Sequence, residues 1–387
     1  MSEAPQTPES DRVSGYPHPR ETTRLIGQAA AEREFLGAWA EGRLHHGWLL
    51  RGSRGVGKAT LAYRIARALI TDGPTGEAAL FGPSAPASLD PPEGCAILQR
   101  IRAQSEPRLT VLRRGLNERG RLRTQISVDD VRAVRRFLSL SAADGGWRVV
   151  IVDPADEMNR SAANALLKVL EEPPVRTVLL LIAHAPAGLL PTIRSRCRTL
   201  DLRPLGAADL AEALAQAGAP VSEADAEALA LLAGGSVGEA LRLIAGDGVA
   251  LYGRLIALFN GGRGVKRGAL MALTDWATGR DAESRFDLVP KLTLTLIGRL
   301  ARHGAMAGAL PGSEAVPEAV PEAVPGEAPL MQAVARSPAQ AALWAEASAR
   351  IAAATAHARA VNLDPGQTII DTFLELDATL TRARDAA

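Results

Sequence analysis

The feature that most constrains this chain is a glycine-rich turn at residues 52–58, which reads Gly-Ser-Arg-Gly-Val-Gly-Lys. A short apolar run over 47–50 leads into the turn, and a segment with apolar positions every three or four residues follows it. This pattern predicts the strand, loop and helix of a phosphate-binding loop, in which backbone N–H groups and a lysine surround phosphate oxygens. The candidate nucleotide-binding residues of the loop are Gly52, Gly55, Gly57, Lys58, Ala59 and Thr60.

The loop lacks groups that a nucleotide hydrolase needs. The residue after the lysine should offer a hydroxyl to a magnesium ion, but it is Ala59, and Thr60 lies about 100° further round the helix. A second apolar run ends in Asp153, where a carboxylate would order the hydration shell of the ion, and the next residue is Pro154, which has no base. We therefore expect a degenerate site that requires no cofactor or metal, with weak binding of ATP or ADP left open.

Composition sets the class of protein. A length of 387 residues suggests two or three domains, and a net charge of +1 gives no overall nucleic-acid signature. The two cysteines, Cys95 and Cys197, are too few for a four-thiolate zinc site, so no zinc is expected. The start of the chain has no signal-peptide pattern, and the longest apolar run, 178–183, is too short to cross a membrane. We expect a cytoplasmic protein with no membrane partner.

The chain is predicted to be α/β in its first half and helical in its second. We expect a mobile N-terminal arm over 1–20, a P-loop-like parallel-sheet domain over 21–205, a small helical lid over 206–247 and an all-α domain over 248–387. Three Glu-Ala-Val-Pro repeats at 314–325 interrupt the last domain. Because repeated prolines prevent a helix, we expect a disordered insert at about 311–329.

Two further motifs carry a resemblance to a known family. The run from Asn164 to Pro174 predicts a helix that ends at a double proline, and Ser195-Arg196-Cys197 precedes the last predicted strand. Together with the loop, these motifs resemble the clamp-loader branch of the AAA+ ATPases over roughly residues 20–250. The resemblance implies an AAA+ domain, a lid and a collar that joins other subunits in a ring.

The resemblance also implies partners and a role. The expected partners are the catalytic ATPase subunits and a delta-like subunit of the DNA polymerase III clamp loader in a pentamer, the sliding clamp indirectly, and primer-template DNA through the assembly. In that family the arginine of the Ser-Arg-Cys triplet is a finger for the nucleotide of the neighbouring subunit, which falls on Arg196, flanked by Ser195 and Cys197. A permanently charged, planar guanidinium suits phosphate oxygens. The competing interpretation is a surface arginine in an ion pair near Asp201.

Departures from the active members of the family all concern ATP chemistry. Besides Ala59 and Pro154, Ala183-His184 replaces a sensing polar residue, and Gly238 stands where the lid normally offers an arginine. We therefore expect a subunit with no catalytic residue for its own site, which braces the ring and supplies Arg196 in trans. Two alternatives remain open, namely an active AAA+ ATPase and a nucleotide-free adaptor with the same fold.

Overall fold

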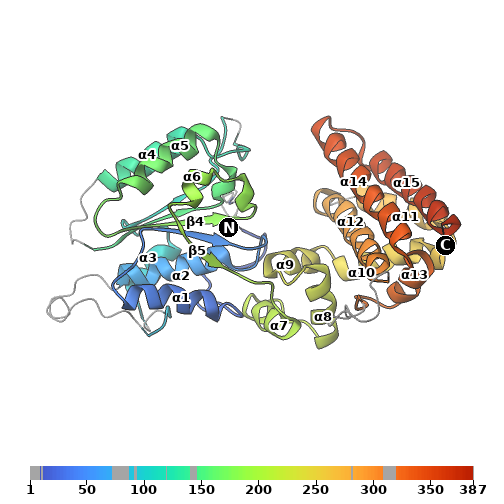
Figure 1. Ribbon diagram of the computed structural model, residues 1–387, viewed down its shortest axis with the longest axis horizontal. Helices are drawn as coiled ribbons and strands as arrows, with labels where there is room; N and C mark the ends of the chain where they lie inside the picture. Colours follow the sequence, from blue (N-terminus) through green and yellow to red (C-terminus); the bar gives the residue numbers. More distant parts are fainter. Residues whose placement is uncertain are drawn as a thin grey trace, which may run out of the picture. The chain divides into compact units, whose positions relative to one another are not determined.

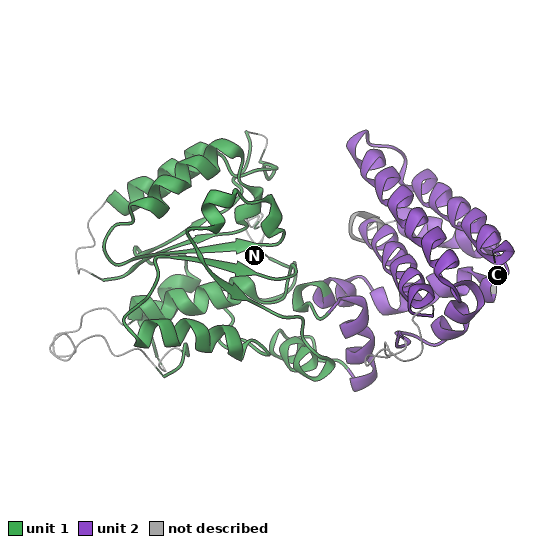
Figure 2. Ribbon diagram, viewed as in Figure 1, with its two compact units in different colours: residues 1–221, 235–239 green, residues 222–234, 240–387 purple. Residues whose placement is uncertain are grey.

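The computed structural model describes residues 9, 12–71, 87–90, 94–118, 120–139, 146–279, 282–307 and 320–386. The chain divides into two compact units (Figure 2). The first contains residues 1–221 and 235–239, and the second contains 222–234 and 240–387.

A parallel sheet of five strands forms the centre of the first unit, in the order β2-β3-β4-β1-β5 (Figure 1). The strands are β1 (Gly47–Arg51), β2 (Leu109–Leu112), β3 (Arg148–Val152), β4 (Thr177–Ala183) and β5 (Arg198–Asp201). The central strands β3 and β4 consist mainly of Val, Leu and Ile and are buried on both faces, as expected for a parallel sheet covered by helices. The predicted α/β class with a P-loop-like parallel sheet is confirmed.

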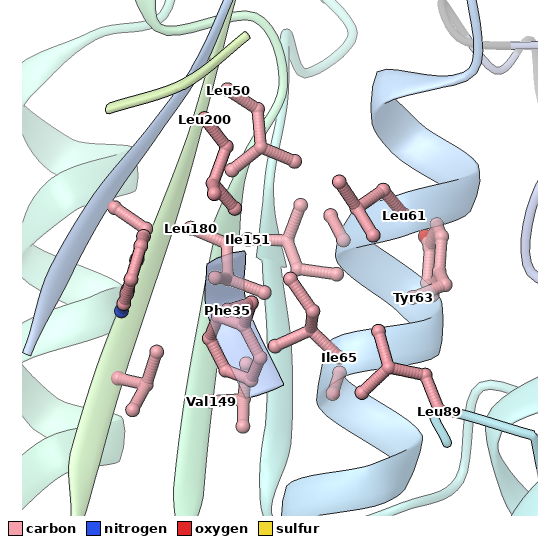
Figure 3. Close-up of a cluster of buried hydrophobic side chains, with 14 of the residues drawn as sticks. Phe35, Leu50, Leu61, Tyr63, Ile65, Leu89, Val149, Ile151, Leu180 and Leu200 are labelled. Carbon is pink, nitrogen blue, oxygen red and sulfur yellow. The ribbon is translucent and has the colours of Figure 1, made fainter. Parts of the chain in front are cut away.

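Helices cover the two faces of this sheet (Figure 1). One layer contains α1 (Ala29–Ala40), α2 (Lys58–Thr71) and α3 (Ala96–Arg102), and the other contains α4 (Val128–Ser139), α5 (Arg160–Glu171) and α6 (Pro191–Arg194). Successive strand residues point to opposite faces, so Ile151 and Leu180 meet Ile65 of α2 (Figure 3), whereas Val150 and Leu179 pack on the other layer. The hydrophobic core of this unit therefore consists of two layers of side chains, one on each face of the β-sheet.

The N-terminal segment packs on the first unit as far as it is described. The Glu9 carboxylate lies 2.7 Å from Arg20 Nη1 and 3.0 Å from Arg113 Nη2, and the His18 side chain is fully buried. Residues 1–8, 10 and 11 lie outside the described part of the chain. For Glu9 and residues 12–20 the expectation of a mobile arm does not hold. The Glu9 carboxylate pairs with Arg20 and with Arg113, and the side chain of His18 is buried.

Helices make up the rest of the described chain. The short helix α7 (Ala207–Gln216) belongs to the first unit. The others are α8 (Glu223–Leu232), α9 (Val237–Ala245), α10 (Gly248–Leu258), α11 (Arg267–Thr278), α12 (Ala282–Met306), α13 (Glu327–Val334), α14 (Pro338–Ala360) and α15 (Pro365–Asp385). This confirms the all-α character predicted after the sheet. None of the described helices is by itself long and apolar enough to cross a membrane, and only the bent pair α8 and α9 passes that test of length and composition together.

The end of the predicted insert is part of the second unit. Residues 311–319 lie outside the described chain, but Ala323 and Val324 are each 8% exposed and α13 begins at Glu327. The fully buried Glu327 carboxylate lies 2.5 Å from Arg299 Nε and accepts hydrogen bonds from Tyr252 and the Ala323 N–H, both 2.7 Å long. The expectation of disorder over 311–329 is therefore wrong for 320–329, because this ionic network anchors the segment.

Candidate functional site

The glycine-rich loop lies where its sequence predicts, at the carboxyl edge of the sheet between β1 and α2. The Lys58 ammonium is buried, with the residue 3% exposed, and it donates hydrogen bonds of 2.6 Å to the carbonyl oxygens of Gly52 and Ser53. Burial disfavours the charged form and lowers the pKa of Lys58 to about 8. The lysine that would hold a phosphate is thus bound to its own loop.

A segment at the start of α9 covers the same loop. Ser236 Oγ donates a hydrogen bond of 2.7 Å to the Arg54 carbonyl, and the Gly238 N–H donates one of 3.0 Å to the Gly55 carbonyl. Gly55 has a φ of 77°, and a Cβ there would lie 2.5 Å from Ser236 Oγ. The loop therefore needs glycine at this position, both for its backbone conformation and for contact with Ser236.

The residues at the positions where a nucleotide hydrolase holds magnesium lie around the loop. Ala59 packs its methyl group against the core, Thr60 is half-buried on α2, and Asp153 is buried just after β3 at the same edge of the sheet. Among the described residues, no group of three or more His, Cys, Asp or Glu side chains is placed to hold a metal ion. Cys95, one of the two cysteines, contacts Thr71.

The two carboxylates after Pro154 have structural partners. Asp156 accepts hydrogen bonds from the backbone N–H groups of His184, at 3.1 Å, and Ala185, at 2.9 Å, so it ties β3 to the end of β4. Glu157 lies 2.7 Å from Arg114 Nε, and burial raises the pKa of its carboxyl group. Both carboxylates make structural contacts, and Pro154 is the residue that follows Asp153.

Arg196 lies at the amino edge of the parallel sheet, two residues before β5 begins at Arg198. Its Nη2 is 2.9 Å from Glu171 Oε1, and its Nη1 donates a hydrogen bond of 3.1 Å to the Thr192 carbonyl. The Asp201 carboxylate, which sequence reasoning offered as a partner, is instead bound by Arg51 at 2.7 and 2.8 Å. Sequence reasoning missed Glu171, although it ends the helix that the double proline terminates.

The residues beside Arg196 have different surroundings. Ser195 is exposed and donates a hydrogen bond of 3.2 Å to the Thr192 carbonyl, which closes the short turn after α6. Burial raises the pKa of the Cys197 thiol to about 12, so this cysteine is a packing group rather than a nucleophile. A Cβ at Gly47 would lie 3.1 Å from the Arg196 carbonyl oxygen and 3.3 Å from Cys197 Sγ. Glycine thus lets the start of β1 pack closely against the arginine turn.

The sequence of this domain is similar to those of known proteins. Residues 27–206 match the family model described as DNA polymerase III, delta subunit. The DNA polymerase III subunit delta' of Pseudomonas aeruginosa is 41% identical over 199 residues, which cover 51% of this chain and 55% of the relative. The subunit delta' of Escherichia coli is 35% identical over 214 residues, covering 55% and 59%. The DNA polymerase III subunit gamma of Buchnera aphidicola subsp. Schizaphis graminum is 28% identical over 230 residues, covering 58% of each.

These matches confirm the resemblance to the clamp-loader branch of the AAA+ family. The chain spans between one half and two thirds of the length of these relatives. The matched region includes both the Lys58 loop and the Arg196 turn.

Proposed function

We propose, from the match of residues 27–206 to the DNA polymerase III delta subunit family, that this chain is a delta-prime-type subunit of the DNA polymerase III clamp loader. In this role it braces a pentameric ring and supplies Arg196 to the ATP site of a neighbouring catalytic subunit. Its partners are the catalytic ATPase subunits and a delta-like subunit, and the assembly places the sliding clamp on primer-template DNA.

The position of Arg196 is the observation that carries this proposal. Arg196 precedes β5, whereas Gly52 and Lys58 follow β1, and the two strands are parallel neighbours. The two sites therefore lie at opposite edges of the sheet, separated by the length of a strand, roughly 16 Å at about 3.3 Å per residue. An arginine side chain cannot span that gap, which supports a role for Arg196 at the nucleotide of another subunit rather than at the Lys58 loop of its own chain.

The state of the Lys58 loop supports a role without hydrolysis. Ala59 offers no oxygen to a metal ion, and Pro154 offers no base to an attacking water. The Lys58 ammonium already donates hydrogen bonds to the Gly52 and Ser53 carbonyls within the chain. An active ATPase would need the hydroxyl and the carboxylate that these positions lack.

The test is an Arg196→Ala variant in the reconstituted assembly, with Arg194→Ala as the matched control because Arg194 is exposed two positions earlier. We expect Arg196→Ala to assemble with an unchanged melting temperature but to lower ATP hydrolysis at the adjacent catalytic subunit and ATP-dependent clamp loading. Arginine fingers contribute about 10³–10⁵ in rate in GTPases, and one site among several gives a smaller loss in the summed signal. Arg196→Lys should rescue poorly, because lysine lacks the planar paired donors.

Normal hydrolysis and loading by Arg196→Ala would contradict the finger and favour the nucleotide-free adaptor. Unfolding of the variant would instead assign Arg196 a structural role. Failure of the intact chain to bind the catalytic subunits would contradict the whole proposal.

A further inference from the structure

The Arg196 guanidinium is held by two oxygens of its own chain. Nη2 lies 2.9 Å from Glu171 Oε1 and Nη1 lies 3.1 Å from the Thr192 carbonyl oxygen. The side chains of Arg196 and Glu171 are 39% and 47% exposed, so the pair lies at the surface. A guanidinium has five N–H donors, and these two contacts leave donors for a further acceptor.

The position of the Glu171 backbone is set by the carboxyl end of α5. Glu171 is the last residue of α5, whose N-cap is Asn159, with a hydrogen bond of 2.8 Å from the Ala162 N–H to Asn159 Oδ1. The carbonyl of the preceding residue, Leu170, is 2.8 Å from His46 Nε2 at the start of β1. Glu171 therefore projects from a helix end that is tied to the sheet, beside the turn that carries Arg196.

The local charge also favours a cation at this point. The carboxyl end of a helix carries partial negative charge, and Glu171 and Glu172 add two carboxylates to the end of α5. A guanidinium placed here is attracted to the helix end without being buried. Because exposed ion pairs contribute little, the contact orients Arg196 without holding it against a stronger acceptor such as a phosphate.

We propose that Glu171 is a positioning residue for Arg196, which restricts the guanidinium to the orientation in which it meets the γ-phosphate bound by the neighbouring subunit. This inference rests on the proposed function of Arg196 in trans. An unrestrained arginine must lose rotamer freedom when it binds, and Glu171 removes part of that loss beforehand. Glu171 itself does not touch the nucleotide.

The experiment uses the reconstituted assembly with Glu171→Ala, Glu171→Gln and the control Glu172→Ala, each also combined with Arg196→Ala. We expect Glu171→Ala to lower kcat for ATP hydrolysis at the adjacent site by about two- to five-fold, with an unchanged KM for ATP and an unchanged melting temperature. Glu171→Gln should recover part of the rate, because its amide oxygen still accepts a hydrogen bond. Glu172→Ala should match the unmodified chain, and Glu171→Ala should have no further effect beside Arg196→Ala.

Three results would overturn the positioning role. They are a kcat of Glu171→Ala equal to or above that of the unmodified chain, an effect that persists in full beside Arg196→Ala, and an equal effect of Glu172→Ala. These outcomes differ from a failure of the proposed function, in which Arg196→Ala alone leaves hydrolysis unchanged.

Discussion

The Lys58 ammonium lies 2.6 Å from the carbonyl oxygen of Gly52, the first residue of its own loop. In a loop that binds a nucleotide, this lysine reaches the β- and γ-phosphates. Here the ammonium donates hydrogen bonds to loop carbonyls. Ser236 and Gly238 donate hydrogen bonds to the carbonyls of Arg54 and Gly55 in the same loop. A phosphate would compete with the Gly52 and Ser53 carbonyls for the Lys58 ammonium, and Ala59 would offer no oxygen to a metal ion beside it.

The isolated chain is therefore expected to show no ATP hydrolysis above background. Lys58→Ala should leave that background unchanged, and Ala59→Thr should not create activity, because Pro154 still offers no base. Phosphate release from purified chain with magnesium and ATP measures this directly. Turnover that disappears in Lys58→Ala would show an active site and reject the non-hydrolysing role.

The pKa of Lys58 predicts an alkaline dependence of stability. Burial lowers this pKa from 10.5 to about 8. Between these values the unfolded chain keeps the proton and the folded chain releases it, so the free energy of unfolding should rise with pH across this range. At 1.36 kcal/mol per pKa unit the rise is roughly 3 kcal/mol.

Lys58→Met should remove this rise, whereas Lys168→Met should keep it because Lys168 is exposed on α5. Denaturant unfolding of both variants and the unmodified chain from pH 7 to pH 11 gives the comparison. Parallel curves for Lys58→Met and the unmodified chain would contradict the assigned pKa.

The buried pair Arg299–Glu327 should be a main determinant of stability in the second unit. The side chains are 8% and 0% exposed, so Glu327→Ala leaves a buried guanidinium without its carboxylate. We expect a loss of about 3–5 kcal/mol in the free energy of unfolding. Asp287→Ala, which breaks an exposed pair with Arg359, should cost less than about 1 kcal/mol. Similar losses for the two variants in chemical denaturation would show that the buried network is not essential.

Deletion of 314–325 should lower the melting temperature of the full chain. The deletion removes the Pro321 carbonyl, which accepts a hydrogen bond of 2.5 Å from Arg299, and the buried side chains of Ala323 and Val324. Composition alone predicts that this segment can be removed without cost, so differential scanning calorimetry separates the two expectations. An unchanged melting temperature would mean that 320–325 does not contribute to the packing of the second unit.

Local patterns predicted most of the sheet and the helices. The runs at 149–152 and 178–182 are apolar throughout, which is typical of a strand buried on both faces, and β3 and β4 lie there. The glycine spacing at 52–58 predicted the loop, because glycine supplies the positive φ that the turn needs. Each of these patterns depends only on residues that are close together in the sequence.

Contacts between distant residues could not be predicted in the same way. Glu327 is buried because Arg299 lies against it 28 positions away, and Glu9 is ordered by Arg113 more than 100 positions away. The partner of Arg196 is Glu171 rather than Asp201, because the end of α5 meets the turn before β5 in space only. A helix signal for α13 was present, since Leu330, Met331 and Val334 follow Pro325-Gly326 at helical spacing, but the proline repeats obscured it.

A Cβ at Gly47 would lie 3.1 Å from the Arg196 carbonyl oxygen, so the start of β1 packs closely against the turn that carries the arginine. One end of the strand seats the turn that carries the arginine, and the other end continues into Gly52 and the Lys58 loop. A change in the loop that shifted β1 would move the arginine at the far edge. Under the proposed function, the glycine-rich loop would therefore keep a structural role even without ATP hydrolysis, because it continues the strand against which the Arg196 turn packs.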